Sequence, residues 1–350
     1  TLGEPEVETA AADICLLLSG EAAYRQEITE ANVVPALIES AKSQNPATCQ
    51  SSLRVLAHLA WWSHMRTCII HAEVMPTLAS LIEQTPSIVP GDLLTEKLIL
   101  HIITYISCVS EEYKVMLVQN NILPLLDILF CRLSSSGDIA CALHARKFIA
   151  MSVRSLTASQ GAINKLVGDG AIRLVCNIMC AGEDTNSDVY ENCAISLYSV
   201  AQTQYYNDVL LEQGLLKAIS RLAQHPECFG IAASILYLLS SDPQHRELVV
   251  LDSGARNLLF AIADQPTHSK SAIQFCAQTL FCLSRCAAES REVLISAGLV
   301  PLLLRLSGHD DENVASPCAA ALRNLSSEGS SAIEEGTVSR LLAEALSYPR

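Results

Sequence analysis

The sequence predicts an all-α solenoid of about seven to eight short repeats. A short phrase recurs, in which a small or polar residue precedes two mostly apolar residues, a punctuating residue and a leucine-rich run. It begins at residues 32, 73, 121, 170, 214, 254, 298 and 336. Its steps lie near forty residues, a spacing typical of solenoids. Half of the residues are apolar and 17% are charged, which suits a core extended in one dimension.

The stretch 271–305 illustrates the elements expected in each repeat. Apolar residues at helical spacing predict a helix over 271–285, namely Ile273, Cys276, Ala277, Leu280 and Leu283. A polar stretch over 286–291 follows, and Gly298 supplies a tight turn. The next helix spans 299–307 with Pro301 in its first turn, where a missing N–H is tolerated. Two longer stretches, 84–92 and 133–138, are interpreted as surface spacers.

Composition and motifs exclude several classes of function. The net charge of −14 argues against a nucleic-acid partner, which would require a basic stripe. The apolar runs are too short for membrane insertion. Phosphate-loop, nucleophile-elbow and His-Glu-x-x-His motifs are missing, and the nine histidines are scattered, with His245 in a polar loop. The sequence therefore predicts a protein that is not an enzyme and carries no cofactor.

The fourteen cysteines lie mostly within apolar helical stretches. The closest pairs, Cys176/Cys180 and Cys282/Cys286, are one helical turn apart and lack the spacing of zinc knuckles. We therefore interpret the cysteines as small core residues in a reducing compartment, which predicts a cytoplasmic location. A metal-binding or regulatory thiol is the alternative.

The repeats resemble the armadillo family. Two stretches carry most of the resemblance, Ala297-Gly298-Leu299-Val300-Pro301-Leu302-Leu303 and Ala319-Ala320-Ala321-Leu322-Arg323-Asn324-Leu325-Ser326. It implies a right-handed superhelix whose long third helices line a concave groove, where a recurring asparagine holds an extended peptide. We expect one armadillo domain over 1–350, with a truncated first repeat, excised from a longer protein.

Aligning the repeats by their glycine corners identifies the candidate groove residues. The asparagine position keeps the family residue at Asn324 alone, and the family's tryptophan is missing, which disfavours an import receptor. The candidates are Arg54, His58, Trp61, His101, Tyr105, Arg154, Tyr198, Gln202, Tyr237, Gln278, Phe281, Arg285, Arg323 and Asn324. Adjacent helical residues point about 100° apart, so we expect Trp61 to face the groove and Trp62 the repeat interface.

The groove positions contain arginine, histidine and aromatic residues but no acid. They favour a groove for an extended, acidic or aromatic segment of another protein. The alternative is that such helices are simply poor in charge.

The sequence thus predicts a scaffold or adaptor. A structural subunit of a cytoskeletal or cortical assembly, bound through its flanks, is the alternative. In overall character, the cysteine-rich repeats resemble the domain of Inscuteable-type adaptors, which implies a role in cell polarity at the cytoplasmic cortex. The oligomeric state stays open.

Overall fold

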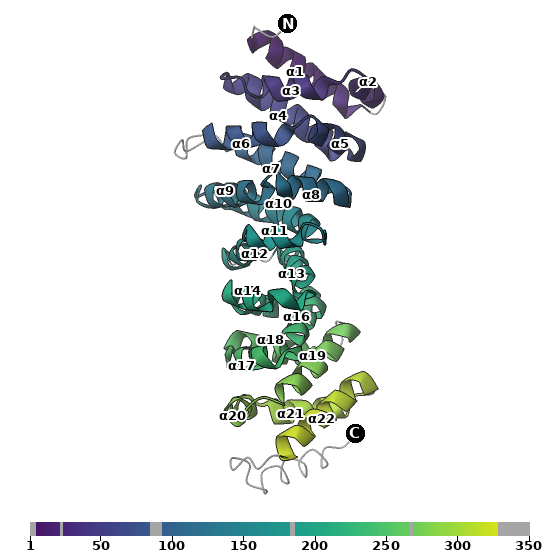
Figure 1. Cartoon of the computed structure of the whole chain (residues 1–350), viewed down its shortest axis with the longest axis vertical. Helices are drawn as coiled ribbons and strands as arrows, with labels where there is room; N and C mark the ends of the chain where they lie inside the picture. The colour runs from purple at the N-terminus through teal and green to yellow at the C-terminus, as the bar shows by residue number, and fades with distance from the viewer. Residues whose placement is uncertain (1–4, 22–23, 85–92, 183–185, 266–268, 328–350) are drawn as a thin grey trace. The chain divides into compact units, whose positions relative to one another are not determined.

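A computed structural model describes residues 5–21, 24–84, 93–182, 186–265 and 269–327. Within these ranges every regular element is helical, and the helices recur in sets of three (Figure 1). The first helices are α2 (Arg25–Glu30), α5 (Ser63–His71), α8 (Glu111–Gln119), α11 (Ile163–Gly168), α14 (Asn207–Glu212), α17 (Pro243–Leu251) and α20 (Ala288–Ser296). The second helices are α3 (Val33–Ser40), α6 (Val74–Gln84), α9 (Ile122–Ser134), α12 (Ala171–Cys180), α15 (Leu215–Ser220), α18 (Ser253–Asp264) and α21 (Leu299–Ser307).

The third helices are the longest of each set. They are α4 (Pro46–Trp61), α7 (Leu94–Ser107), α10 (Ile139–Thr157), α13 (Ser187–Ala201), α16 (Phe229–Ser241), α19 (Lys270–Leu283) and α22 (Glu312–Ser327), preceded by α1 (Pro5–Gly20). Short 3-10 turns lie before α14 (η2, Gln204–Tyr206) and before α16 (η3, Arg221–Gln224, and η4, Pro226–Cys228). These sets confirm the predicted all-α repeat architecture.

The recurring phrase places a left-handed residue between the first and second helices. Six of its first residues have φ between 49° and 96°, namely Asn32, Glu73, Asn121, Gly170, Gly214 and Gly298. The phrase at 254 differs, because α18 begins at Ser253 and the Asp252 carboxylate accepts the Ala255 N–H. Gly254 is instead a site of close approach, where an added Cβ would lie 2.5 Å from the Cβ of Ser220. The phrase at 336 lies outside the described residues.

Two element boundaries differ from the sequence prediction. The polar stretch 286–291 was expected between helices, but α20 begins inside it at Ala288. Only Ser290 and Leu294 of that helix are buried, so its apolar signal is weak. The spacer predicted at 133–138 is shorter, since α9 continues to Ser134 and the Asp138 carboxylate caps α10. Residues 85–92 of the other predicted spacer lie outside the described residues.

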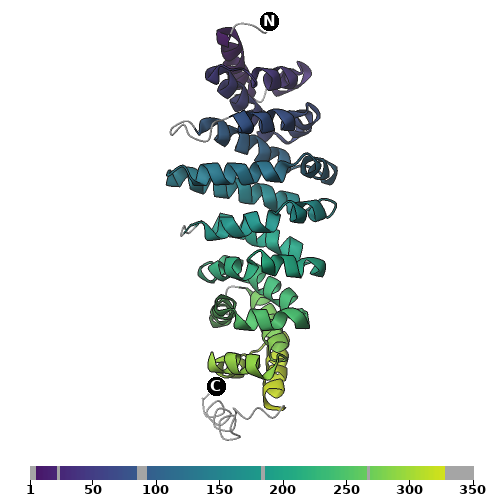
Figure 2. The same cartoon turned by 60° about the vertical axis from the view of Figure 1, so that its left-hand side comes forward.

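Contacts group the chain into two compact units, residues 1–174 and 175–350, with the boundary inside α12. In the first unit α1 packs on α4, α4 on α7 and α7 on α10, while in the second α13 packs on α16, α16 on α19 and α19 on α22. Within each unit the third helices therefore follow one another in chain order (Figures 1 and 2). The single domain over 1–350 stays a prediction.

The packed sides of the third helices form the core. All five apolar residues predicted from the spacing in 271–285 are buried. The cysteines contribute as well, because all fourteen are free thiols and eight of them are buried. Burial raises the pKa of Cys176, Cys228 and Cys318 to about 12, with Cys180 and Glu227 adding to the effect at the first two. These thiols are therefore protonated core residues at neutral pH.

Candidate protein-binding surface

The predicted groove residues all lie on the third helices or directly after them. In the first unit they are Arg54, His58 and Trp61 on α4, His101 and Tyr105 on α7, and Arg154 on α10. In the second they are Tyr198 and Gln202 at the end of α13, Tyr237 on α16, Gln278, Phe281 and Arg285 on or after α19, and Arg323 and Asn324 on α22. None of these side chains is buried. We call the surface that they form within each unit the third-helix face.

In the first unit the third-helix face carries a continuous row of rings. Trp61 meets Tyr105 edge-on with ring centroids 5.2 Å apart, and His101 lies 4.6 Å from Phe148. Tyr105 and His144 also contact Phe148, at 6.5 and 4.5 Å. This aromatic row, Trp61, Tyr105, His101, His144 and Phe148, spans α4, α7 and α10. The Trp61–Tyr105 and Tyr105–Phe148 pairs each contribute roughly 0.5–1.5 kcal/mol beyond their buried area, which helps to hold the row in place.

Two members of the row were missing from the sequence prediction. His144 and Phe148 lie on α10, one turn apart, nearer its N-terminus than the aligned groove position of that repeat. The sequence does contain a signal for them, because two rings spaced four residues apart on a third helix lie on the same side of that helix. The alignment omitted it because it followed only the positions near the family's asparagine.

The two imidazoles of the row are hydrogen-bonded to each other. Nε2 of His101 lies 2.9 Å from Nε2 of His144, so one nitrogen donates and the other accepts. Burial lowers the pKa of both rings, and that of His144 falls to about 4, with His101 and Lys97 adding to the effect. The pair is therefore neutral at neutral pH.

A hollow of about 390 Å³ lies beside the aromatic row, between α1, α4 and α7. Its lining consists of Leu16, Arg54, Ala57, His58, Trp61, Leu98, His101 and Tyr105. The structure thus brings five of the predicted residues together at one place. Trp61 is 62% exposed and Trp62 is 7% exposed, in agreement with the orientations expected for adjacent helical residues.

The second unit has a wider hollow of about 710 Å³, beside Tyr198 and between α13, α16 and α19. Glu227 lines it together with Gly230 and Ser234. The expectation of a groove without acid therefore does not hold here. Glu227 lies in the short η4 turn before α16, whereas the prediction considered only positions on the third helices.

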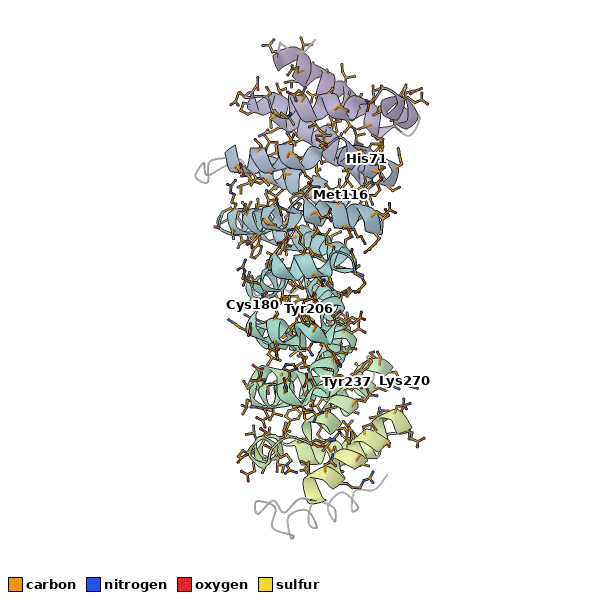
Figure 3. The ribbon with its side chains drawn as sticks, viewed as in Figure 1. His71, Met116, Cys180, Tyr206, Tyr237 and Lys270 are labelled. Carbon is orange, nitrogen blue, oxygen red and sulfur yellow. The ribbon has the colours of Figure 1, made fainter. Side chains whose placement is uncertain are left out.

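Further along the face of this unit, aromatic side chains stand in pairs or beside a cation. The Tyr237 ring packs 5.7 Å from Phe275, and the Arg285 guanidinium lies 6.0 Å from the centre of Phe281. Figure 3 shows Tyr237 on α16 and Lys270 at the start of α19. Gln202, Gln278 and Arg323 line neither of the two hollows.

Arginines of two first helices cap the third helices before them. Arg66 donates from Nε to the Ala60 carbonyl and from a terminal nitrogen to the Trp61 carbonyl. Arg246 repeats this arrangement on the carbonyls of Ser240 and Ser241. Both arginines satisfy carbonyls that a helix C-terminus leaves without partners. Sequence reasoning missed them, although each stands five residues after the last residue of its third helix.

The structure also shows the surroundings of His245, which differ from those expected, and of Asn324. His245 was expected in a polar loop, but it lies in α17, is 5% exposed and contacts the Asp208 carboxylate at 2.8 Å. The polar stretch there is the start of a helix, capped by Asp242 with Pro243 in its first turn. Asn324, which keeps the family residue, donates its side-chain amide to Oγ of Ser284 at 3.0 Å.

The described ranges contain no group of three or more histidine, cysteine, aspartate or glutamate residues that could hold a metal ion. In the same ranges no single helix is long and apolar enough to cross a membrane. The bent pair α8 and α9 meets that requirement by length and composition alone.

Comparisons with known proteins support the repeat assignment. Residues 288–327, which contain α20, α21 and α22, match the armadillo/β-catenin-like repeat family. The fold is similar to that of an engineered protein of known crystal structure, with a TM-score of 0.66 and 20% identity over 99% of this chain and 79% of that one. At this identity the likeness concerns the fold alone. A search of curated protein sequences found no match.

More distant similarities are to designed armadillo repeat proteins. One, designed for modular peptide recognition, has a TM-score of 0.48 and 18% identity over 83% of this chain and 99% of that one. Another, solved in complex with the peptide (KR)4, has a TM-score of 0.45 and 18% identity over 83% of this chain and 99% of that one. The three-helix sets and the matched repeat together define an all-α armadillo-repeat solenoid.

Proposed function

We propose that the protein is a non-enzymatic scaffold that binds an extended segment of another protein along its third-helix face. The observation that carries this proposal is the aromatic row, in which rings from three consecutive third helices stand in contact at the surface. Aromatic residues and arginine are the usual anchors of protein interfaces. Trp61 is exposed at one end of this row, and contiguous exposed apolar surface marks sites of protein interaction.

The spacing of the third helices suits an extended ligand. Packed helices lie about 8–10 Å apart, and an extended chain advances about 3.3 Å per residue. One repeat therefore corresponds to two or three residues of a bound segment, and alternate side chains of the segment would face the surface. Several pockets along the segment, rather than one deep site, would set the specificity.

An acidic or aromatic segment suits this surface best. Arg54, Arg154, Arg285 and Arg323 are exposed on the face of a chain whose net charge is −14. Arginine forks bind carboxylates in two-point contacts. In the second unit, the Glu227 carboxylate beside the wider hollow would repel an acidic segment. The preference for an acidic segment in that unit therefore applies to the part of the face near α19 and α22. A cytoplasmic role in cell polarity or cytoskeletal organisation would suit such an adaptor and belongs to the same proposal.

A charge-reversal pair tests the proposal. Arg154→Glu with Arg285→Glu changes one exposed arginine of the face in each unit. Arg173→Glu with Lys217→Glu makes the same change on the exposed side of two second helices. Partners captured from lysate by the wild-type protein should be lost with the first pair and kept with the second. Binding should also weaken as salt is raised, because the Debye length falls to about 8 Å at physiological ionic strength.

The alternative is a structural subunit of a cytoskeletal or cortical assembly that is bound through its flanks. In that case the second pair of substitutions, and not the first, would reduce capture. Melting curves of both variants are the control for folding, since all four side chains are exposed.

A further inference from the structure

Resting on the proposed function, we infer that the hollow between α1, α4 and α7 is an anchor site. It would take one large apolar side chain, such as phenylalanine or leucine, from a partner segment with an aspartate or glutamate beside it. Three features of the hollow lead to this inference, namely its shape, the engagement of its polar groups and its one charged residue.

The hollow is large enough to accept one large apolar side chain. Ala57 and Leu98 are buried at its floor, and the small Ala57 side chain leaves room above α4. Leu16, Trp61 and Tyr105 complete an apolar wall. The volume of about 390 Å³ is near the lower end of the range for ligand pockets, about 300–1,000 Å³.

The imidazoles of the lining are already engaged with other side chains. Nδ1 of His58 contacts Oγ of Ser19, and Nε2 of His101 contacts Nε2 of His144. An entering apolar group would not have to strip water from these two nitrogens, which lowers the cost of filling the hollow.

Arg54 is the one lysine, arginine, aspartate or glutamate among the lining residues. It is exposed, and within the described ranges no carboxylate forms an ion pair with it. A guanidinium at the rim of an apolar hollow matches a carboxylate next to an apolar side chain. The same residue would repel a segment with lysine or arginine at that position, so Arg54 provides selectivity as well as attraction.

The tryptophans make occupancy of the hollow visible. The chain has two, Trp61 and Trp62. Trp62 is nearly buried, whereas Trp61 is exposed and lines the hollow. A bound side chain should therefore shield Trp61 from an aqueous quencher such as acrylamide, while Trp62 is shielded in both states.

Selection of random twelve-residue phage-displayed peptides on the full chain tests the inference. We expect enriched peptides to share a large apolar residue adjacent to aspartate or glutamate, and their synthetic forms to reduce acrylamide quenching. Arg54→Glu should weaken their binding about tenfold, and Trp61→Ala about thirtyfold. In the peptide, replacing the apolar residue by alanine or the acid by lysine should have similar effects.

Matched variants show whether the hollow is responsible. Lys217→Glu reverses a charge on the second helix α15, away from the third-helix face, and Tyr205→Ala removes a ring that is 84% exposed in η2. Both should leave peptide binding unchanged. The two charge-reversal variants should melt as the wild type does, and Trp61→Ala and Tyr205→Ala, which each lose one ring pair, should melt no more than a few degrees lower. If Arg54→Glu unfolds the chain, Arg54→Gln replaces it, with about a threefold loss expected.

The outcomes separate this inference from the proposed function. Suppose that binding of the enriched peptides is unaffected by Arg54→Glu and Trp61→Ala but is lost with Arg154→Glu and Arg285→Glu together. That result would overturn the anchor site and leave the proposed peptide-binding face intact. Enriched peptides without a shared apolar–acidic pair would also overturn it. Failure to enrich any peptide would count against both.

Discussion

Gly254 offers a sharp test of how the repeats pack, because the usual effect of a glycine-to-alanine substitution should be reversed there. Alanine at a helical position normally stabilises a protein by up to about 1 kcal/mol. Gly254 is the second residue of α18, and a Cβ added there would lie 2.5 Å from Cβ of Ser220 and 3.2 Å from Oδ1 of Asp252. Ordinary contact requires about 3.5–4.0 Å between carbon atoms. The helices α15 and α18 would therefore have to separate by about 1 Å.

Overpacking of this kind costs about 1–3 kcal/mol, which exceeds the gain in helix propensity. We expect Gly254→Ala to be destabilising by about 1–2 kcal/mol. The matched control is Gly230→Ala, at the second position of α16 in the same unit, where the nearest atoms would be hydroxyl oxygens at 3.5 and 3.6 Å. That substitution should be neutral or stabilising by a few tenths of a kcal/mol.

Urea unfolding followed by circular dichroism measures both effects. Adding Ser220→Gly to Gly254→Ala removes the opposing Cβ, so the double variant should recover stability relative to the sum of the single changes. In thermal melts each kcal/mol corresponds to about 2–4 °C for a domain of 150–250 residues. If Gly254→Ala is as stable as Gly230→Ala, or if Ser220→Gly gives no recovery, the close approach does not explain why glycine is present.

Three further expectations follow from the core and from the imidazole pair. Leu280→Ala removes a fully buried side chain of α19 and should cost about 2–5 kcal/mol in urea unfolding. A reductant should leave the melting temperature unchanged, because the fourteen cysteines are free thiols; a fall of many degrees would contradict this. In the folded chain the pKa of His144 is lowered to about 4, whereas in the unfolded chain histidine titrates near 6.5. Between these two pH values the unfolded chain therefore binds more protons than the folded chain. Stability should therefore fall as pH drops from about 6.5 to 4, and His144→Gln should reduce that fall; equal pH profiles would refute the role of the pair.

Much of the fold was predictable because the repeat is a local feature of the chain. The phrase that begins at residues such as Asn121 and Gly298 marks a left-handed corner, and that conformation is set by a few neighbouring atoms. The apolar spacing in α19 likewise identified its buried side. The first helices were harder to predict, because α20 buries only two residues and so lacks a strong apolar period.

The candidate site was predictable only in part. The positions of Arg54, Trp61 and Tyr105 followed from helical periodicity and the alignment of corners. The contacts between helices did not, because pairs such as His101 and His144 are 43 residues apart in the chain and meet only after two repeats have packed. Glu227 was missed for a related reason, since a turn outside the aligned helix reaches the same surface.

The arginines illustrate how the same residue type is divided between stability and binding. Arg66 and Arg246 direct their donors to backbone carbonyls at the ends of α4 and α16, so these donors are used within the fold. Arg54 and Arg285 are exposed on the third-helix face, where Arg285 lies over the Phe281 ring. A count of arginines near the groove therefore overstates the number of hydrogen-bond donors that a partner meets. The residues that can discriminate between partners are those whose donors the fold leaves unused, and Arg54 has an apolar hollow beside it.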